Sequence, residues 1–465
     1  MNRVDRGLRA AGAFLALAVA ALILNPSGAY ATPGFARQAG LACEACHTVF
    51  PELTPFGRLF KFNAYVFSNV RQLQDINEKS QSTLALTEFP PVSVQLQGSW
   101  TSLGHSLPDT TTPATDLSQK NNVQFPQALS LFYTGKISDN LGAFLQLTWA
   151  PDGDSVGIDN SDLRFADHVG LNAFGATDFI YGVTLNNNPT SQDVWNSTPA
   201  WGFPFLASNI AVGPIASAML DGQLAQSSVG LGGYVWMFNH LYVEVSAYRA
   251  GNTGFGTHPI TGGPGPLDGT VMRISGLAPY WRVAWEQDWG RNSLSFGTFG
   301  MKANTHPVGI GEHGPTDTLT DVALDAQYQF IGDDHIASVY ATWIHEDRDF
   351  NATVAANPHN TLNTVRLTGN YFYKRKFGGS LQLFSTTGSS DPILYASGVP
   401  FGSLNGKPDT RGAVIELDYL PWLNTKLGLQ YTAFAKFNGG NSNYDGAGRN
   451  ASDNNTIFAF IWTAF

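Results

Sequence analysis

Segments in which apolar and polar residues alternate recur along most of this chain, and no other feature of the sequence constrains its fold as strongly. In residues 321–330, for example, Val, Leu, Ala, Tyr and Phe occupy the even positions, whereas most of the odd positions hold Asp or Gln. Successive side chains of a β-strand point to opposite faces. An alternation of period two over about ten residues therefore predicts a strand with one apolar and one polar face.

We count sixteen such segments, and the linkers between them indicate the architecture. The segments lie near 91–100, 123–134, 140–149, 159–167, 174–185, 223–235, 241–249, 279–288, 292–302, 318–329, 334–345, 362–374, 377–386, 411–419, 423–434 and 455–465. Short linkers such as 135–139, 237–240, 289–291, 332–333 and 420–422 alternate with long ones such as 101–122, 186–222, 250–278, 387–410 and 435–454. A bacterial outer-membrane barrel has short periplasmic turns and long outer loops, so this pattern predicts a 16-stranded antiparallel outer-membrane β-barrel with both ends in the periplasm.

The composition agrees with a barrel in a lipid bilayer. Charged residues make up 13% of the chain and aromatic residues 12%, whereas ordinary globular chains have roughly 25% charged residues. No run of about 18 apolar residues follows the N-terminal region, which excludes membrane-spanning helices. A soluble β-sandwich would also alternate, but its loop lengths would seldom alternate so regularly. The net charge is −10, so the chain lacks the excess of basic residues that is typical of nucleic-acid-binding proteins.

In such a barrel the polar faces point into the lumen. The charged residues expected there are Asp162, Arg164, Glu244, Arg282, Glu286, Asp288, Asp321, Asp325, Arg366, Lys374, Glu416, Asp418 and Lys426. A water-filled lumen needs polar residues for that reason alone. A barrel of sixteen strands is also wide enough to admit a small domain.

Residues 43–47 read Cys-Glu-Ala-Cys-His, which is the attachment motif of a c-type haem, and Cys43 and Cys46 are the only cysteines of the chain. On one helical turn both sulfurs face the same side, where each can form a thioether with a haem vinyl group. His47 can then ligate the iron, which makes a one-electron carrier. A Cys43–Cys46 disulfide or half of a zinc site would use the same residues, but no further zinc ligands follow at a recognisable spacing.

Residues 1–31 have the features of a secretory signal peptide. Three arginines precede an apolar stretch at 10–24, and Ala29-Tyr30-Ala31 is an A-x-A cleavage site. Because a c-type haem is attached outside the cytoplasm, this signal and the haem motif support each other. We therefore divide the chain into a signal peptide (1–31), a monohaem cytochrome c domain (32–88) and a transmembrane β-barrel (89–465).

The cytochrome domain is expected to be helical. Residues 34–47 predict a short helix that the prolines at 51 and 55 end, and residues 56–67 predict a second helix with an apolar face against the porphyrin. Arg58 and Lys61 on this helix can neutralise the haem propionates, although they can equally be solvated. Because the segment is small for a free-standing domain, the rest of the chain is expected to complete its pocket.

Several stretches resemble the fused outer-membrane cytochrome–porins. They are GFARQ (34–38), the haem motif, FPELTPFGR (50–58) with Lys61 and Asn63, NSTPAWGFP (196–204) and DGQLAQ (221–226). The resemblance implies a barrel plugged from its periplasmic side by a domain in which Cys43 and Cys46 hold one covalent haem c and His47 is the proximal iron ligand. It also implies oxidation of extracellular Fe(II), with electrons passed to a periplasmic carrier such as a soluble cytochrome c.

The sequence does not assign two sites, the distal ligand of the haem and the entry site for iron. No Met or His lies between residues 48 and 104, so the distal haem ligand does not follow from the sequence, and an open position is equally compatible. The distal candidates are Met219, Met237, Met272, Met301, His105 and His168. Two predicted outer loops gather groups that can hold Fe(II) briefly. They contain His306, Glu312, His313 and Asp317 in one loop and His345, Glu346, Asp347 and Asp349 in the other.

The leading hypothesis is therefore an electron-transfer protein of the outer membrane that oxidises Fe(II), possessing an iron:cytochrome c oxidoreductase activity if iron is the donor. One alternative is a porin-like channel with a haem-bearing plug or sensor, and another is a conduit for a donor other than iron. A haem enzyme acting on a small molecule would need an acid–base group over an open iron position, and no local motif supplies one.

Overall fold

The structure, a computed structural model, describes residues 33–66, 90–107, 119–150, 155–171, 177–251, 272–310 and 313–465. The predicted signal peptide, the boundary at 88/89 and Glu312 lie outside these residues. Three short helices come first, α2 (Pro33–Ala39), α3 (Cys43–Cys46) and α4 (Pro55–Phe62), and brief helical turns occur later at Pro199–Trp201, Met219–Gln223 and Ala451–Asn454. None of the helices in the described residues is long and apolar enough to cross a bilayer.

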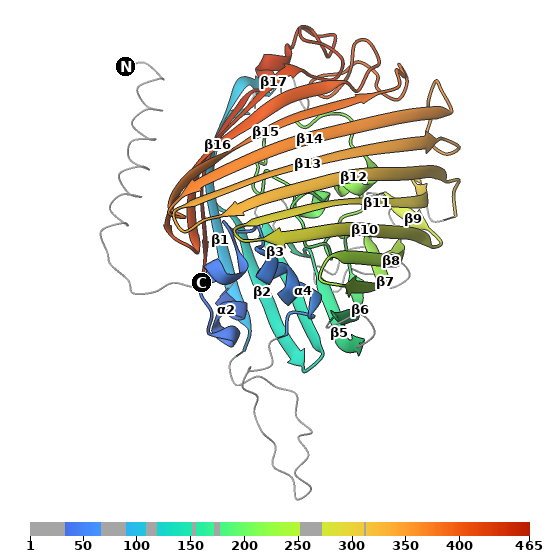
Figure 1. The fold of residues 1–465 in the computed structure, drawn as a ribbon. Helices are drawn as coiled ribbons and strands as arrows, with labels where there is room; N and C mark the ends of the chain where they lie inside the picture. The colour runs from blue at the N-terminus through green and yellow to red at the C-terminus, as the bar shows by residue number, and fades with distance from the viewer. Residues whose placement is uncertain are drawn as a thin grey trace, which may run out of the picture.

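The rest of the chain is dominated by one antiparallel sheet (Figure 1). Its strands are β1 (Val92–Leu107), β2 (Gln119–Ser138), β3 (Leu141–Ala150), β4 (Ser155–Ile158), β5 (Asp162–Leu171), β6 (Thr177–Asn186), β7 (Ser228–Met237), β8 (Leu241–Ala250), β9 (Arg273–Ser275), β10 (Ala278–Trp289), β11 (Asn292–His306), β12 (Asp317–Ile331), β13 (His335–Asp349), β14 (His359–Tyr373), β15 (Phe377–Gly388), β16 (Thr410–Trp422), β17 (Thr425–Lys436) and β18 (Thr456–Ala464).

The sheet closes on itself, because β1 pairs with β18 as well as with β2. The short β4 and β5 pair with successive parts of β3, and β9 and β10 pair with successive parts of β11. Each of these two pairs of segments therefore makes one interrupted strand, and the barrel has sixteen strands. The predicted fold, a closed 16-stranded antiparallel barrel with a small helical N-terminal segment, is confirmed.

The connections fall at two different ends of the barrel. Connections of two or three residues join β2 to β3, β7 to β8, β10 to β11, β12 to β13, β14 to β15 and β16 to β17. We call the end that carries them the turn end. The opposite end, which we call the loop end, carries the long connections, among them residues 389–409 and 437–455.

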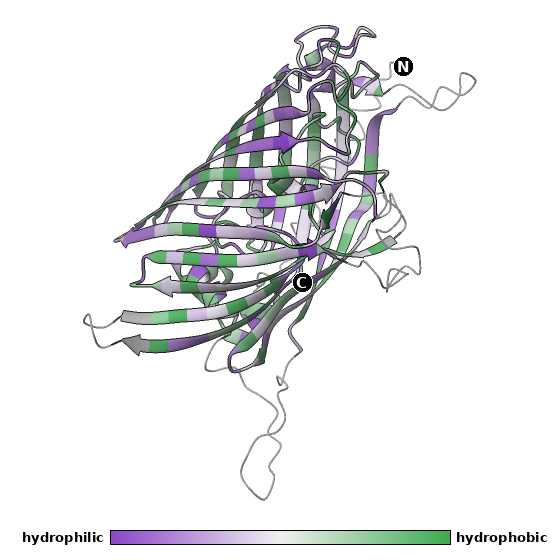
Figure 2. Ribbon diagram, turned by 90° about the vertical axis from the view of Figure 1, so that its right-hand side faces the viewer, coloured by the Kyte–Doolittle hydropathy of each residue, from purple (hydrophilic) through white to green (hydrophobic). Residues whose placement is uncertain are grey.

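The outer surface of the barrel is apolar. Leu231, Val245, Leu324 and Leu417 point outward and are each more than half exposed. Their neighbours in sequence point inward and are mostly polar, so purple and green bands alternate along the strands in Figure 2. A closed sheet with an apolar outside is the reverse of a soluble β-sandwich, whose apolar faces pack against each other.

Residues 33–66, which we call the plug, lie inside the turn end of the barrel (Figure 1). A Cβ atom on Gly34 would lie 2.5 Å from Thr134 Oγ1, so α2 packs directly on β2. On another part of the wall, Tyr65 donates a hydrogen bond of 2.7 Å to Asp162. Helix α4 ends at Phe62 instead of reaching residue 67, because Ala64 and Tyr65 adopt positive φ angles of 56° and 59°. Residues in this left-handed region cannot continue a right-handed helix.

Residues 187–227, which we call the inner segment, connect β6 to β7 and fold into the lumen. The sequence analysis predicted a long linker at 186–222 but did not predict that it folds into the lumen. Ser197 donates to Asp325 on β12, the Phe203 carbonyl accepts from Gln382 on β15, and the Leu206 carbonyl accepts from Gln430 on β17. The inner segment therefore crosses the lumen and contacts walls that lie far from its own strands.

Most charged residues predicted to face the lumen are buried there in ion pairs. Arg282 contacts both Asp193 and Asp325, and Lys426 lies between Glu416 and Asp418. Asp288 and Lys374 instead lie exposed near the turn end. In the described part of the barrel, many lumenal charges thus meet protein partners, whereas the sequence analysis expected water around them.

Candidate functional site

The haem motif is one helical turn. The backbone N–H of His47 donates to the carbonyl of Cys43 at 2.9 Å, which holds Cys43 and Cys46 within a single turn. Thr54 connects this turn to the next helix, because its hydroxyl donates to the Ala45 carbonyl at 2.7 Å and accepts from the N–H of Gly57 at 3.1 Å. A Cβ atom on Gly57 would lie 2.2 Å from the carbonyl oxygen of Cys46, so α4 touches the motif itself.

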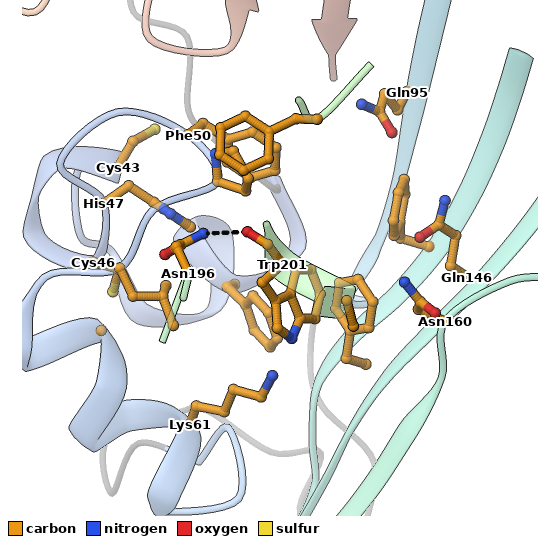
Figure 3. A pocket seen from close by; sticks show the side chains of 18 of the residues that line it. Cys43, Cys46, His47, Phe50, Lys61, Gln95, Gln146, Asn160, Asn196 and Trp201 are labelled. Carbon is orange, nitrogen blue, oxygen red and sulfur yellow. Dashed lines mark hydrogen bonds between the residues drawn. The ribbon is translucent and has the colours of Figure 1, made fainter. Parts of the chain in front are cut away.

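Cys43, Cys46 and His47 line one side of a cavity of about 520 Å³ inside the barrel (Figure 3). The cavity is walled by apolar side chains of the plug, such as Phe35 and Phe60, and by polar side chains of β1 and β3, such as Gln95 and Gln146. Its volume lies in the range of about 300–1,000 Å³ that is usual for pockets of cofactors and drug-sized ligands.

Burial sets the protonation states of the side chains in the motif. Cys43 and Cys46 are not joined in a disulfide in the described residues, and burial, with a smaller contribution from the neighbouring Cys43, raises the pKa of Cys46 to about 11. Burial lowers the pKa of His47 to about 4, against a smaller opposing effect of the backbone at Glu52 and Pro51. The imidazole is therefore neutral at pH 7, as a metal ligand must be. Its Nδ1 atom is buried and has no hydrogen-bond partner among the described residues. The residues present therefore fit a covalently attached haem c.

Aromatic rings surround the imidazole. The Phe50 ring centroid lies 5.0 Å from that of His47 and 4.7 Å from that of Trp462 on β18. Phe50 therefore connects the plug to the barrel wall, and both Phe50 and Trp462 line the cavity. The imidazole is therefore in contact with an apolar ring on this side.

Lys61 also lines the cavity, as predicted for a propionate partner. Its ammonium donates to the carbonyls of Ser191 and Asp193 at 2.9 and 2.8 Å, and lies 4.6 Å from the ring centroid of Trp201. Burial, and secondarily the guanidinium of Arg164, lower the pKa of Lys61 to about 7, although nearby carboxylates oppose the shift. The charge of this lysine is consequently sensitive to pH near neutrality.

Arg58 points away from the cavity, although it lies one turn from Lys61 on α4. Its guanidinium forms an ion pair with Glu286 at 2.8 Å and donates to Ser293 and Gln329 on neighbouring strands. The Arg58 side chain is 1% exposed and is not among the residues that line the cavity. Arg58 thus holds α4 against the barrel wall.

Two further contacts fix the plug in the turn end. The Glu52 carboxylate accepts hydrogen bonds from Thr48, from Ser338 at 2.7 Å and from Asn370. Arg375, in the turn between β14 and β15, donates to the carbonyls of His47 and Thr48 at 3.2 and 2.7 Å. The backbone that carries His47 is therefore bonded directly to the barrel.

None of the proposed distal ligands lines the cavity. Met219, Met272 and Met301 belong to an apolar cluster between the inner segment and β8–β14. Met237 lies at the end of β7, and His105 and His168 are exposed on β1 and β5. Among the described residues, His47 is the one His or Met side chain of the cavity lining.

The two proposed iron-binding loops do not form clusters in the described residues. No group of three or more His, Cys, Asp or Glu side chains there is arranged to hold a metal ion. Glu346 is buried and accepts from the backbone N–H of Met219, whereas His345 and Asp347 pair with each other at 3.3 Å and are partly exposed. The alternation of β13 therefore separates residues that the sequence places side by side.

The sequence analysis missed the contribution of the inner segment to the cavity. Asn196, Trp201 and Phe205 line it, and Asn196, which lies beside His47, donates to the carbonyl of Trp201 at 2.9 Å (Figure 3). The only sequence signal was the resemblance of residues 196–204 to the cytochrome–porins. That resemblance carried no information about position in the fold.

Comparisons with known proteins assign no family to this chain. No protein-family model matches the chain, and no curated protein matches it. Similar solved structures include OmpT of Vibrio cholerae, an outer membrane protein, in a form without loop L8 (11% identity, 80% of this chain and 98% of that chain, TM-score 0.41). They also include the outer membrane channel DcaP of Acinetobacter baumannii (14%, 80% and 96%, TM-score 0.45) and OmpF of Salmonella typhi in complex with daunomycin (10%, 80% and 97%, TM-score 0.44). Likeness at these values says nothing of function.

Proposed function

We propose that this protein is a monohaem c-type cytochrome enclosed in an outer-membrane barrel, and that it transfers electrons between a donor outside the cell and a carrier in the periplasm. The observation that carries the proposal is that Cys43, Cys46 and His47 line one cavity of about 520 Å³ within the barrel. A haem c bound there supplies a one-electron redox centre.

The residues of the chain have distinct tasks in this proposal. Cys43 and Cys46 tether the porphyrin, and the neutral imidazole of His47 ligates the iron. The rings of Phe50, Phe60 and Trp462 exclude water from the iron. The Lys61 ammonium on the cavity wall would pair with a haem propionate. Two of its three N–H donors bond to the carbonyls of Ser191 and Asp193, and the third is left for the propionate.

The outer-membrane location rests on the apolar outer face of the barrel. A contiguous apolar face of this size is stable only against lipid or another protein, and a closed barrel leaves no unpaired strand edge in the bilayer. The turn end, which holds the plug, would then face the periplasm, as short turns do in outer-membrane barrels. The haem segment would thus be reached from the periplasmic side.

We propose Fe(II) as the extracellular donor. In this reaction one Fe(II) ion gives one electron to the ferric haem iron and leaves as Fe(III), and a periplasmic carrier such as a soluble cytochrome c then takes the electron. Support for iron comes from the resemblance in residues 34–61, and a different one-electron donor would use the same haem site. An iron:cytochrome c oxidoreductase activity follows if the donor is iron.

The alternative function is a porin-like channel with the haem segment as plug or sensor. The filled lumen favours electron transfer over solute diffusion. Trp195, Thr198 and Met219 of the inner segment are each fully buried, and the plug occupies the turn end beneath them. A solute would have to displace both segments, whereas an electron needs no open path.

The test is a redox experiment on the purified protein. We expect mass spectrometry to find one covalently bound haem, the reduced-minus-oxidised spectrum to be of the c type, and Fe(II) to reduce the haem at a pH where iron stays soluble. Cys43→Ala with Cys46→Ala is the matched control, which we expect to lose the covalent haem. A protein that binds no haem would disprove the proposal, and a haem that Fe(II) leaves oxidised would exclude iron as the donor.

A further inference from the structure

We call the cavity that Cys43, Cys46 and His47 line the haem cavity. A second, smaller cavity of about 180 Å³ lies on the other side of the inner segment. Its wall on the barrel side consists of Tyr340 and Thr342 on β13, Thr368 on β14 and Gln382 on β15. The haem cavity lies against β1–β3 on another part of the wall. Residues Asn196, Pro199, Gly202 and Pro204 line both cavities. A single stretch of chain, residues 196–204, therefore forms the partition between the two.

The smaller cavity is lined by one buried hydroxyl without a protein partner among the described residues. Tyr340 is 4% exposed, and its hydroxyl has no hydrogen-bond partner in the part of the chain that the structure describes. A buried hydroxyl without a partner costs free energy unless water or a ligand bonds to it. The cavity is also lined by three groups that have protein partners: the Thr342 hydroxyl donates to the Ser197 carbonyl, the Thr368 hydroxyl accepts from Gln382 at 3.0 Å, and the Asp221 carboxylate pairs with Arg366. It is thus built for a small hydrophilic guest.

The position of this cavity along the strands puts it on the loop side of the plug. On β13, Ser338 bonds to Glu52 of the plug, Tyr340 and Thr342 line the cavity, and Glu346 bonds to Met219 of the inner segment. These residues follow one another from the turn end to the loop end.

An ion pair between Arg366 and Asp221 borders the same cavity. Arg366 Nη2 lies 2.6 Å from Asp221 Oδ2, and the Arg366 side chain is 32% exposed, so solvent reaches this border. A guest arriving through the loop end would meet this ion pair before it met the plug.

We propose that the smaller cavity is the docking site of the electron donor, and that the donor is a small hydrated metal ion whose water ligands bond to Tyr340, Thr342 and Thr368. The inference rests on the proposed function. A docked Fe(II) ion loses one electron across the 196–204 partition to the ferric haem iron and departs as Fe(III). The partition separates the ion from the haem cavity, and four of its residues, Asn196, Pro199, Gly202 and Pro204, line both cavities.

The first test uses the purified holoprotein and stopped-flow mixing with aqueous Fe(II). Tyr340→Phe removes the hydroxyl and keeps the ring, and we expect haem reduction to slow by about three- to tenfold, as for one lost hydrogen bond. The haem spectrum and the reduction by dithionite should stay unchanged. Thr364→Val is the matched control, because the Thr364 hydroxyl is likewise buried and unpartnered among the described residues but does not line the cavity. Equal rates for Tyr340→Phe and wild type would overturn the inference.

The second test measures access without reference to turnover. Thr368→Cys is exposed to a small methanethiosulfonate reagent added at the loop end of protein in outer-membrane vesicles, and the mass of the product is measured. We expect labelling of the thiol introduced by Thr368→Cys, no labelling of Ala323→Cys in the buried wall, and slower reduction by Fe(II) after labelling. An unlabelled Thr368→Cys, or a labelled one with an unchanged rate, would refute the docking site.

The two proposals fail in different ways. If the methanethiosulfonate reagent labels Cys43 and Cys46 of the wild type, then these residues carry no thioether bonds to haem. This result would disprove the proposed function. If the haem is present but Fe(II) does not reduce it, the same variants are compared with hexaammineruthenium(II), a small hydrophilic one-electron donor. A slower rate in Tyr340→Phe would then support the docking site, and an equal rate would overturn it.

Discussion

The ammonium of Lys61 is the ionisable group most able to change the properties of the proposed haem site within the physiological range of pH. It lies on the cavity wall, is buried, and has a pKa lowered to about 7 by burial. A nearby positive charge stabilises a reduced haem more than an oxidised one, because reduction adds one negative charge. Protonation of Lys61 should therefore raise the reduction potential.

We expect the haem potential of the wild type to fall as the pH rises through about 7, because Lys61 then loses its proton. In Lys61→Met this step should be absent and the potential should stay low at every pH. Each tenfold change in the equilibrium corresponds to about 59 mV for one electron, and we expect a step of that order. Potentiometric titration at pH 6 and pH 8 measures it, with Lys136→Met outside the cavity as the control. A step that persists in Lys61→Met would show that another group is responsible.

Glu52 makes the docking of the plug depend on pH. Burial is the main cause that raises the pKa of its carboxyl above the usual 4.5, against hydrogen bonds from Ser338, Thr48 and Asn370 that lower it. A carboxyl whose pKa is raised in the folded state binds a proton more tightly there than in the unfolded state. Its ionisation therefore weakens docking as the pH rises above about 4.5, and docking is strongest in acid.

We expect the amides of residues 47–54 to be better protected from hydrogen exchange at pH 4 than at pH 7, after correction for the intrinsic exchange rate. Glu52→Gln keeps the shape and cannot ionise, so its protection, corrected for the intrinsic exchange rate, should vary less with pH than that of the wild type. Exchange followed by mass spectrometry measures both proteins. Protection that is greater at pH 7 than at pH 4 in the wild type would contradict the assigned direction of the pKa shift.

At the scale of elements, the contact between α3 and α4 sets the geometry of the motif. A methyl group at Gly57 would collide with the backbone carbonyl of Cys46, which cannot move without moving Cys46 and His47. Thr54 bonds to both helices. The two helices thus behave as one unit, even though each has only one or two turns.

We expect Gly57→Ala to lower the yield of haem-loaded protein strongly, because the added methyl displaces α3 from α4. Thr54→Val removes the cap of α4 but adds no clash, so it should lower the stability of the plug by about 1 kcal/mol and leave haem loading near normal. Haem content per polypeptide, from the absorbance of the reduced protein, measures both variants. Equal haem content in Gly57→Ala and wild type would show that the helices need not touch.

The strands could be predicted from the sequence because each carries its own evidence. Alternation of apolar and polar residues follows from having lipid on one side of a strand and protein or water on the other, and each segment shows it independently. The haem motif is equally local, since the chemistry needs its residues within one turn. The end of α4 was less predictable, because the positive φ angles of Ala64 and Tyr65 arise from contacts with the barrel.

Features that depend on distant contacts could not be predicted. Arg58 and Lys61 lie three residues apart on one helix, yet one reaches Glu286 in the wall and the other reaches the haem cavity. Similarly, the inner segment has no periodicity, so its sequence resembles that of an exposed loop. Its place in the lumen is set by partners such as Asp325 and Gln430 on remote strands.

At the scale of the whole molecule, two internal segments fill a barrel whose wall is held by its own hydrogen bonds. The wall is continuous from β1 to β18 without help from either segment. The inner segment adds buried ion pairs, such as Asp193 with Arg282, and apolar contacts around Met219 and Leu220. Barrel assembly and closure of the lumen are therefore separable properties.

This separation predicts the effect of shortening the inner segment. If residues 197–222 are replaced by a short Gly-Ser linker, the barrel should still fold, because the β6–β7 hydrogen bonds do not involve them. The lumen should open, so we expect single-channel conductance in planar bilayers to rise from near zero in the wild type to a porin-like value. The haem cavity loses its Trp201 wall in this variant, and reduction by Fe(II) should cease to depend on Tyr340. A wild type that already conducts like an open porin would contradict the closed lumen and would favour the channel function instead.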